Sequence, residues 1–259
     1  MTLASPNQIN MMSLNKIIAL ILITMVVRYA EAGEVRVAVA ANFAAPIKTI
    51  AEVFEKETGT KIQISLGSSG KLFAQIQNGA PFDVFLSADN IKPATLIANG
   101  YAVKNSEFTY ALGTLVLWSR DTRNTKHVLE SSDYRKLAIA NPRLAPYGLA
   151  AMETLEHLNL TVDTKNKLVQ GENIAQTYQF VASGNADLGF VALSQVIQDG
   201  KAPPQSWVVP SELHSPIRQD AALLMRGKAN QEAIAFLHFL RSKTAAAIIR
   251  RYGYGLEKQ

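Results

Sequence analysis

The 259-residue sequence contains no Cys, which excludes disulfide bonds and a lipid-modified cysteine within it. It also lacks a run of Lys or Arg residues of the kind that binds nucleic acid, so the net charge of +5 does not predict a nucleic-acid partner. Four His are present, but they are scattered without the spacing of metal ligands: His127, His157, His214 and His238. The composition that remains, 48% hydrophobic and 18% charged, is that of a globular protein.

The N-terminus has the features of an export signal. Lys16 precedes an apolar run, Ile17 to Val27, and Ala30-Glu31-Ala32 places small residues where signal peptidases cut. The run is shorter than a membrane-spanning helix requires. We therefore predict that residues 1–32 are a signal peptide that is removed and that the mature protein is periplasmic, a short membrane anchor or buried helix being the alternative. Three Met are candidate start sites: Met1, Met11 and Met12.

After residue 32, segments in which every second residue is apolar, as in strands, alternate with segments whose apolar residues have helical spacing. The predicted strands are Glu34–Val39, Lys61–Leu66 and Asp83–Leu86, and the predicted helices are Ala44–Thr58, Gly70–Asn78 and Asn90–Ala98. This βαβαβα order predicts a parallel, doubly wound α/β sheet.

The same alternation resumes beyond Thr114–Trp118, a strong strand at which we predict that the chain crosses into a second lobe. Asp220–Met225 is the predicted return crossing, and no flexible linker separates the two parts. We predict two doubly wound α/β lobes joined by two crossing strands, with a ligand cleft between them. Lobe I comprises residues 33–113 and 221–259, and lobe II comprises residues 114–220.

At several places a strand or loop leads directly into a helix. These places are Asn42, Ser69, the turn Pro146-Tyr147-Gly148 and Asn173-Ile174. The first N–H groups of a helix have no partner within it and lie at the positive end of the helix dipole. In doubly wound sheets such turns share the carboxyl edge, where ligands bind. The sequence therefore predicts a cage of hydrogen-bond donors for a small oxyanion.

Motifs for catalysis are incomplete in this sequence. Gly67-Ser68-Ser69-Gly70-Lys71 departs from the phosphate-binding P-loop at Ser65 and Leu72, and from the G-x-S-x-G nucleophile elbow at Lys71. Asp83 and Asp89 are interpreted as structural residues at the start of a strand and at a helix cap. We therefore predict a binding protein that is not an enzyme, with no catalytic residue and no cofactor.

Several motifs together resemble the molybdate-binding periplasmic components of ABC transporters, a family of type 2 periplasmic binding proteins. The most specific is Gly79-Ala80-Pro81-Phe82-Asp83-Val84-Phe85-Leu86-Ser87-Ala88-Asp89. The others are Val37–Pro46, Gly67–Leu72, Asn141-Pro142 to Gly148, Gly189-Phe190-Val191 and Arg251-Tyr252-Gly253.

The resemblance implies the roles of individual residues. Asn42, with the Ala41 and Asn42 amides, would bind one oxo group and the Ser69 hydroxyl and N–H another, while Tyr147 and the Ile174 amide would complete the cage. Molybdenum would be bound as the oxyanion, with no direct metal ligand. Many members of the family carry a ligand Tyr where this sequence has Ala192, and we predict that the Tyr147 hydroxyl replaces it.

The resemblance also implies that the protein delivers molybdate, and tungstate of nearly the same size, to an inner-membrane ABC permease. A monomer is expected. The alternatives are a binder of sulfate, chromate, phosphate or a small carboxylate. From other classes, a secreted α/β hydrolase would need a nucleophile with a base, and a ligand-sensing regulator would carry a DNA-binding segment; the motifs of this sequence predict neither.

Overall fold

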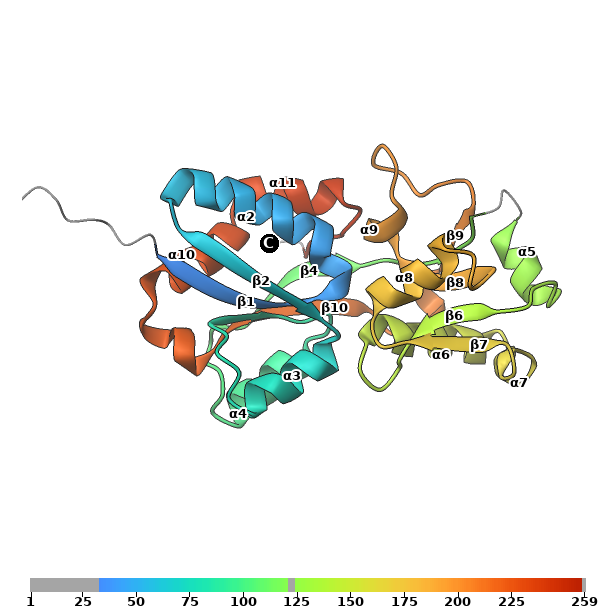
Figure 1. Ribbon diagram of the computed structural model, residues 1–259, viewed down its shortest axis with the longest axis horizontal. Coiled ribbons are helices and arrows are strands. Elements are labelled where there is room, and N and C mark those ends of the chain that lie inside the picture. Colours follow the sequence, from blue (N-terminus) through green and yellow to red (C-terminus); the bar gives the residue numbers. More distant parts are fainter. Residues whose placement is uncertain (1–32, 121–123, 258–259) are drawn as a thin grey trace, which may run out of the picture. The chain divides into compact units, whose positions relative to one another are not determined.

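The computed structural model describes residues 33–120 and 124–257, so the predicted signal peptide, residues 1–32, lies outside the described residues. A compact unit begins at Glu34. Its described residues contain two five-stranded sheets, each covered by helices (Figure 1). The chain passes from the first sheet to the second at Thr114 and returns before Ile217.

The first sheet has the strand order β2-β1-β3-β10-β4. Its strands are β1 (Glu34–Ala40), β2 (Lys61–Gly67), β3 (Val84–Leu86), β4 (Phe108–Gly113) and β10 (Ile217–Leu223). The helices that accompany it are η1 (Ala41–Phe43, a 3-10 helix), α2 (Ala44–Thr58), α3 (Ser69–Gln77), α4 (Ile91–Ala98), η3 (Met225–Ala229), α10 (Gln231–Leu240) and α11 (Lys243–Arg251).

The alternation of side chains along β1 explains why helices cover both faces of this sheet. Val35, Val37 and Val39 pack into a core with apolar residues of α2, α10 and α11. Ala38 points to the other face, where it packs with Leu72 of α3 and other residues of α3 and α4. Figure 1 shows α2, α10 and α11 on one side of the sheet and α3 and α4 on the other.

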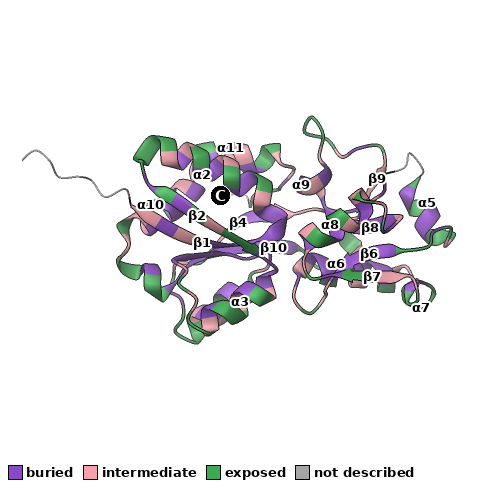
Figure 2. Ribbon diagram, viewed as in Figure 1, coloured by how far each residue is buried: buried purple, intermediate pink, exposed green. Residues whose placement is uncertain are grey.

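The second sheet has the order β7-β6-β8-β5-β9. Its strands are β5 (Leu115–Trp118), β6 (Leu137–Ala140), β7 (Leu168–Gly171), β8 (Leu188–Ala192) and β9 (Ser206–Val208). Its helices are α5 (Thr125–Glu130), α6 (Pro146–His157), α7 (Thr161–Thr164), α8 (Ile174–Ala182), α9 (Leu193–Val196) and η2 (Ser211–Leu213). The central strands of both sheets are buried, and the exposed residues gather on the outer helix faces (Figure 2).

The predicted doubly wound α/β architecture is confirmed, with the difference that both sheets are mixed. β1 runs parallel to β2 and β3, and β6 runs parallel to β7 and β8. β10 and β5, in contrast, run antiparallel to β3 and β8. A strand that arrives from the other sheet starts beside the carboxyl ends of the parallel strands. It therefore runs antiparallel to them.

The strand β10 touches both hydrophobic cores. Ile217 at its start packs into the core of the second sheet, whereas Ala221 packs into the core of the first. The lobe boundaries given above stay a prediction. Among the described residues, no helix has both the length and the apolar character needed to cross a bilayer.

Local sequence patterns also predict strands at Lys136–Ala140, Leu188–Leu193 and Trp207–Val209, which match β6, β8 and β9, but they predict neither β7 nor β4. β7 is four residues long and ends in Gly171, which pairs with Ala140 of β6. β4 is paired along β10, across a bulge between Gln219 and Asp220. Both strands owe their existence to a partner far away in the chain, which a pattern of local residues does not show.

Candidate functional site

A small cavity lies where helices of both sheets begin. Its lining contains all five predicted site residues: Ala41, Asn42, Ser69, Tyr147 and Ile174. The other lining residues are Ala40, Gly67, Ser68, Ala88, Ala145, Pro146 and Asn173. Ala41, Asn42 and Ser69 follow strands of the first sheet, whereas Tyr147 and Ile174 begin helices that pack on the second. The structure therefore brings together residues more than a hundred positions apart in the sequence.

Local sequence explains why helices start at the cavity. The Ser68 hydroxyl caps α3 by accepting the Lys71 N–H at 3.4 Å. The Asn173 side chain caps α8 by accepting the N–H groups of Ala175 and Gln176 at 3.0 and 3.1 Å. α6 starts with Pro146, whose fixed φ suits a first helical position. The N–H groups of Ser69, Tyr147 and Ile174 lie in the first turns of their helices, where no helix carbonyl is available to accept them. The two side-chain caps bind N–H groups of other positions and leave these three free of a cap.

Ser69 is placed as a hydrogen-bond donor to the cavity. It is 1% exposed, and its Oγ accepts the N–H of Ala88 at 2.9 Å. A hydroxyl that accepts one hydrogen bond keeps its own proton for another partner. Ser69 thus offers both an O–H and a first-turn N–H in the same place.

The Asn42 side chain is differently occupied. Its Nδ2 donates to Gln219 Oε1 at 2.7 Å and to Tyr254 Oη at 3.0 Å. An amide group has two N–H donors, and these contacts use both. The contribution that Asn42 can make to an anion is therefore its backbone N–H, which belongs to the first turn of η1 together with that of Ala41.

The Tyr147 hydroxyl lies toward the crossing between the sheets. Its Oη accepts from Gln219 Nε2 at 3.5 Å, and it approaches Gly113 so closely that a side chain at Gly113 would collide with it. Burial raises the pKa of Tyr147 well above its usual value, and burial raises the pKa of Tyr254 to about 12. Both hydroxyls are therefore neutral at physiological pH.

The cavity is small and uncharged. Its volume is about 10 Å³, whereas pockets for organic ligands measure roughly 300–1,000 Å³. None of the described residues that line it carries a charge. At its rim, Lys71 Nζ meets Glu172 Oε1 at 2.6 Å, and the Gly70 N–H donates to the Leu144 carbonyl at 2.8 Å. Both contacts join the start of α3 to the second half of the fold.

A metal centre does not emerge from the part of the chain that the structure describes, because no three His, Asp or Glu lie close enough to hold an ion. The two carboxylates considered above have structural partners. Asp83 binds the Arg36 N–H at 2.8 Å and Arg226 Nη1 at 2.7 Å. Asp89 Oδ1 accepts the Lys92 N–H at 2.9 Å at the start of α4.

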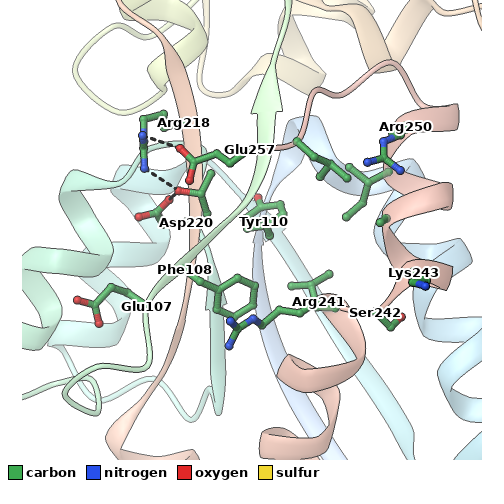
Figure 3. A pocket seen from close by; sticks show the side chains of 15 residues that line it. Glu107, Phe108, Tyr110, Arg218, Asp220, Arg241, Ser242, Lys243, Arg250 and Glu257 are labelled. Carbon is green, nitrogen blue, oxygen red and sulfur yellow. Dashed lines mark hydrogen bonds and ion pairs between the residues drawn. The ribbon is translucent and has the colours of Figure 1, made fainter. Parts of the chain in front are cut away.

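A second, much larger pocket of about 990 Å³ lies beside β4, α10 and α11 (Figure 3). None of the predicted site residues lines it. Its charged side chains carry both signs: Glu107, Arg218, Asp220, Arg241, Lys243, Arg250 and Glu257. Arg218 Nη1 meets Glu257 Oε1 at 2.6 Å, and Arg241 lies over the Phe108 ring at 5.0 Å. Several of these charges are thus already engaged within the protein.

Comparisons with known proteins show the family of this chain. The family described as bacterial extracellular solute-binding protein matches residues 35–255. The chain belongs to the bacterial extracellular solute-binding protein family. The molybdate-binding protein ModA of Azotobacter vinelandii is 53% identical over 232 residues, covering 88% of this chain and 92% of the relative. ModA of Rhodobacter capsulatus is 48% identical over 230 residues, covering 88% and 90%.

Solved structures show the same fold for this solute-binding protein. The Azotobacter vinelandii periplasmic molybdate-binding protein superposes with a TM-score of 0.83 at 40% identity, covering 86% of this chain and all of the other. The sulfate-binding protein SubI of Mycobacterium tuberculosis has a TM-score of 0.67 at 14% identity, covering 86% of each chain, and shares the fold alone. The resemblance inferred from the motifs is thereby confirmed.

Sequence reasoning missed three residues behind the cavity of this solute-binding protein. Gln219, Ser194 and Tyr254 are buried and contact Asn42. A signal existed for one of them, because Gln219 and Asp220 are polar residues within a strand that is otherwise mostly apolar. The other two lie in segments whose local pattern says nothing about the site.

Proposed function

We propose that the protein captures molybdate in the periplasm and delivers it to an ABC permease of the inner membrane. The proposal is supported by family membership and by the molybdate-binding relatives at 53% and 48% identity. One observation carries it for this chain: the five residues inferred from the sequence line a single uncharged cavity where η1, α3, α6 and α8 begin.

The donor set suits an anion that has no proton. Molybdate is a tetrahedral dianion that can only accept hydrogen bonds, and the N–H groups of Ser69, Tyr147 and Ile174 and the Ser69 hydroxyl can all donate. Hydrogen phosphate brings an O–H that would find no acceptor among these donors. Leaving such a group unpaired costs about 1–3 kcal/mol, which is enough for the site to discriminate.

The charge of the anion is stabilised without a buried cation. The N-termini of α3, α6 and α8 each present the positive end of a helix dipole together with unpaired N–H groups. Lys71 lies at the rim, where Glu172 already pairs with it, so it adds little net charge. Neutral donors favour a small dianion here, because no cationic side chain has to lose its hydration when the anion binds.

Sulfate is also a dianion without a proton, so the donors cannot reject it for an unpaired O–H, and the size of the cavity must distinguish it from molybdate. Tungstate has nearly the same size as molybdate and should bind nearly as well. Sulfate binding is the second candidate, because sulfate can only accept hydrogen bonds from the same neutral donors. A hydrolase is disfavoured, because no His, Asp or Glu stands among the described residues of the cavity lining. We propose that the protein acts as a monomer without a cofactor or nucleic-acid partner, and that molybdate is its cargo.

Competition calorimetry with molybdate, tungstate, sulfate and phosphate tests the proposal on the purified protein. We expect saturable 1:1 binding of molybdate and tungstate that excess sulfate or phosphate does not displace. Tighter binding of sulfate than of molybdate would select the second candidate. An absence of heat with all four anions would contradict an oxyanion-binding role.

A further inference from the structure

Behind the cavity lies a connected group of buried polar side chains, which we call the Tyr254 network. Its members come from six separate segments of the chain and are between 0% and 8% exposed: Asn42, Tyr110, Tyr147, Ser194, Gln219 and Tyr254. Two of them, Asn42 and Tyr147, also line the cavity. The network therefore connects the candidate anion site with parts of the protein that do not touch the anion.

Tyr254 holds Asn42 at two points. Its Oη donates to the Asn42 carbonyl at 2.7 Å and accepts from Asn42 Nδ2 at 3.0 Å. The Ser194 hydroxyl donates to the same carbonyl at 2.9 Å. Asn42 belongs to η1, which follows a strand of the first sheet, and Ser194 belongs to α9, which follows a strand of the second. The Asn42 carbonyl therefore accepts a hydrogen bond from a residue that accompanies the other sheet.

Gln219 extends the network from Asn42 to Tyr147. Its Oε1 accepts from Asn42 Nδ2 at 2.7 Å and from Tyr110 Oη at 3.3 Å. Its Nε2 lies 3.5 Å from Tyr147 Oη. Because the two ends of an amide have opposite roles, these contacts fix the orientation of Gln219 between a residue of η1 and a residue of α6.

The backbone around Tyr254 is itself held firmly. Gly253 ends α11 with φ at 80°, a left-handed conformation that favours glycine and turns the chain toward the site. Gly255 and Leu112 then exchange two backbone hydrogen bonds, at 2.8 and 2.9 Å. The Tyr254 ring packs edge-on against Phe43 at 5.2 Å between ring centroids. The hydroxyl is thus presented to Asn42 from a rigid support.

We propose that Tyr254 is a positioning residue of the anion site: its hydroxyl fixes the η1 turn so that the Ala41 and Asn42 N–H groups are aimed at the oxyanion. This inference rests on the proposed function. Donors must be held within about 0.5 Å of the productive geometry by supporting contacts. Tyr254 and Ser194 bind the Asn42 carbonyl, which belongs to the peptide group that follows the Asn42 N–H, and Tyr254 also binds the Asn42 side chain. These contacts hold Asn42 on the side-chain and carbonyl side of its Cα, and the Asn42 N–H extends from the same Cα.

The test is Tyr254→Phe, which removes the hydroxyl and keeps the ring against Phe43. We expect the Kd for molybdate to rise about tenfold, mostly through faster dissociation, in the range of one lost buried hydrogen bond. The matched control is Tyr252→Phe, two residues away on the same segment. Its hydroxyl bonds Thr49 Oγ1 at 3.0 Å, away from the cavity lining, and its loss should leave Kd unchanged.

Two further measurements separate positioning from a purely structural role. In ¹H–¹⁵N spectra of the anion-loaded protein, Tyr254→Phe should shift the Asn42 backbone amide and Tyr252→Phe should not. Ser194→Ala removes the other donor to the same carbonyl and should raise Kd by a few-fold, so it keeps the test valid if Tyr254→Phe does not fold.

A lower melting temperature of Tyr254→Phe with unchanged Kd, dissociation rate and Asn42 amide would overturn the inference and leave the proposed function intact. If the wild-type protein binds neither molybdate nor any other of the four anions, the proposed function fails and the inference fails with it. If Tyr254→Phe does not fold, an unchanged Kd in Ser194→Ala likewise overturns the inference.

Discussion

The small cavity at the helix starts and the large pocket beside β4 differ in almost every property that is used to recognise a binding site. The cavity measures about 10 Å³ and is lined by neutral groups, whereas the pocket measures about 990 Å³ and contains seven charged side chains. Volume and charge would favour the pocket as the anion site. The direction of the donors favours the cavity, because three helix N-termini converge there.

Under the proposed function, this contrast means that an anion site depends on oriented donors more than on cationic side chains. In the pocket, Arg218 is engaged by Glu257, so part of its positive charge is neutralised within the protein. In the cavity, the partial charges of first-turn N–H groups are left open to a ligand. Three experiments test the roles assigned to the cavity and the pocket.

The largest effect is expected from Ser69→Ala in the cavity. The variant loses a hydroxyl that can donate to the anion, and charge-assisted hydrogen bonds are worth about 1.5–3 kcal/mol. We expect molybdate affinity measured by calorimetry to fall by about one to two orders of magnitude. The melting temperature should fall as well, because the Ala88 N–H loses its acceptor.

The control for Ser69→Ala lies in the large pocket. Arg250 lines that pocket and takes no part in the cavity, so Arg250→Ala should change the molybdate Kd by less than about twofold. If Arg250→Ala weakened binding and Ser69→Ala did not, the roles assigned to the two pockets would be reversed.

A second effect concerns the neutral hydroxyls behind the cavity. Burial raises the pKa of Tyr110 and of Tyr147 well above the usual value near 10, and raises the pKa of Tyr254 to about 12. In the unfolded chain these groups ionise near pH 10, whereas in the folded protein they keep their protons. Their contribution to stability is therefore complete below about pH 10 and is lost as the pH rises through the folded pKa.

The free energy of unfolding should accordingly fall above pH 10, by up to about 1.4 kcal/mol per pH unit for each such group. Denaturant titrations between pH 8 and pH 11.5 measure this slope. Tyr254→Phe removes one of the groups and should give a shallower slope than the wild type. Equal slopes would show that Tyr254 does not remain protonated above pH 10.

The smallest effect is expected at the rim of the cavity. Lys71 and Glu172 are 51% and 47% exposed, and exposed ion pairs contribute about 0–1 kcal/mol. Lys71→Ala should therefore speed molybdate dissociation by no more than a few-fold, and added salt should reduce the difference from the wild type. Stopped-flow fluorescence measures the rate.

Lys126→Ala is the matched control, because Lys126 pairs with Glu130 within α5 at similar exposure, 45% for each side chain. A charge-swapped variant, Lys71→Glu with Glu172→Lys, should restore slow dissociation if the pair itself matters. Dissociation that stays fast in the swapped variant would show that the positive charge of Lys71 acts alone. Anion binding at the cavity would then depend partly on a cationic side chain.

Much of the site could be predicted from local sequence. The apolar alternation of β1, the Ser68 and Asn173 caps and Pro146 at the start of α6 are short-range signals, and each predicts a strand end or a helix start. The carboxyl-edge rule for doubly wound sheets then predicts that such turns meet. This rule indicates Asn42, Ser69, the Pro146–Gly148 turn and Asn173-Ile174, and the family resemblance adds Ala41 and the individual roles; the cavity lining contains all five predicted residues.

Only the tertiary structure decided which atoms of these residues remain available. The amide of Asn42 is used by Gln219 and Tyr254, which lie 177 and 212 positions away in the chain, and the Tyr147 hydroxyl lies beside the same Gln219. Helix starts are encoded within a few residues, because capping is a contact between neighbours. Hydrogen bonds between distant segments depend on how the sheets pack. That packing engages the side chain of Asn42 and leaves its backbone N–H as the group that we propose binds the anion.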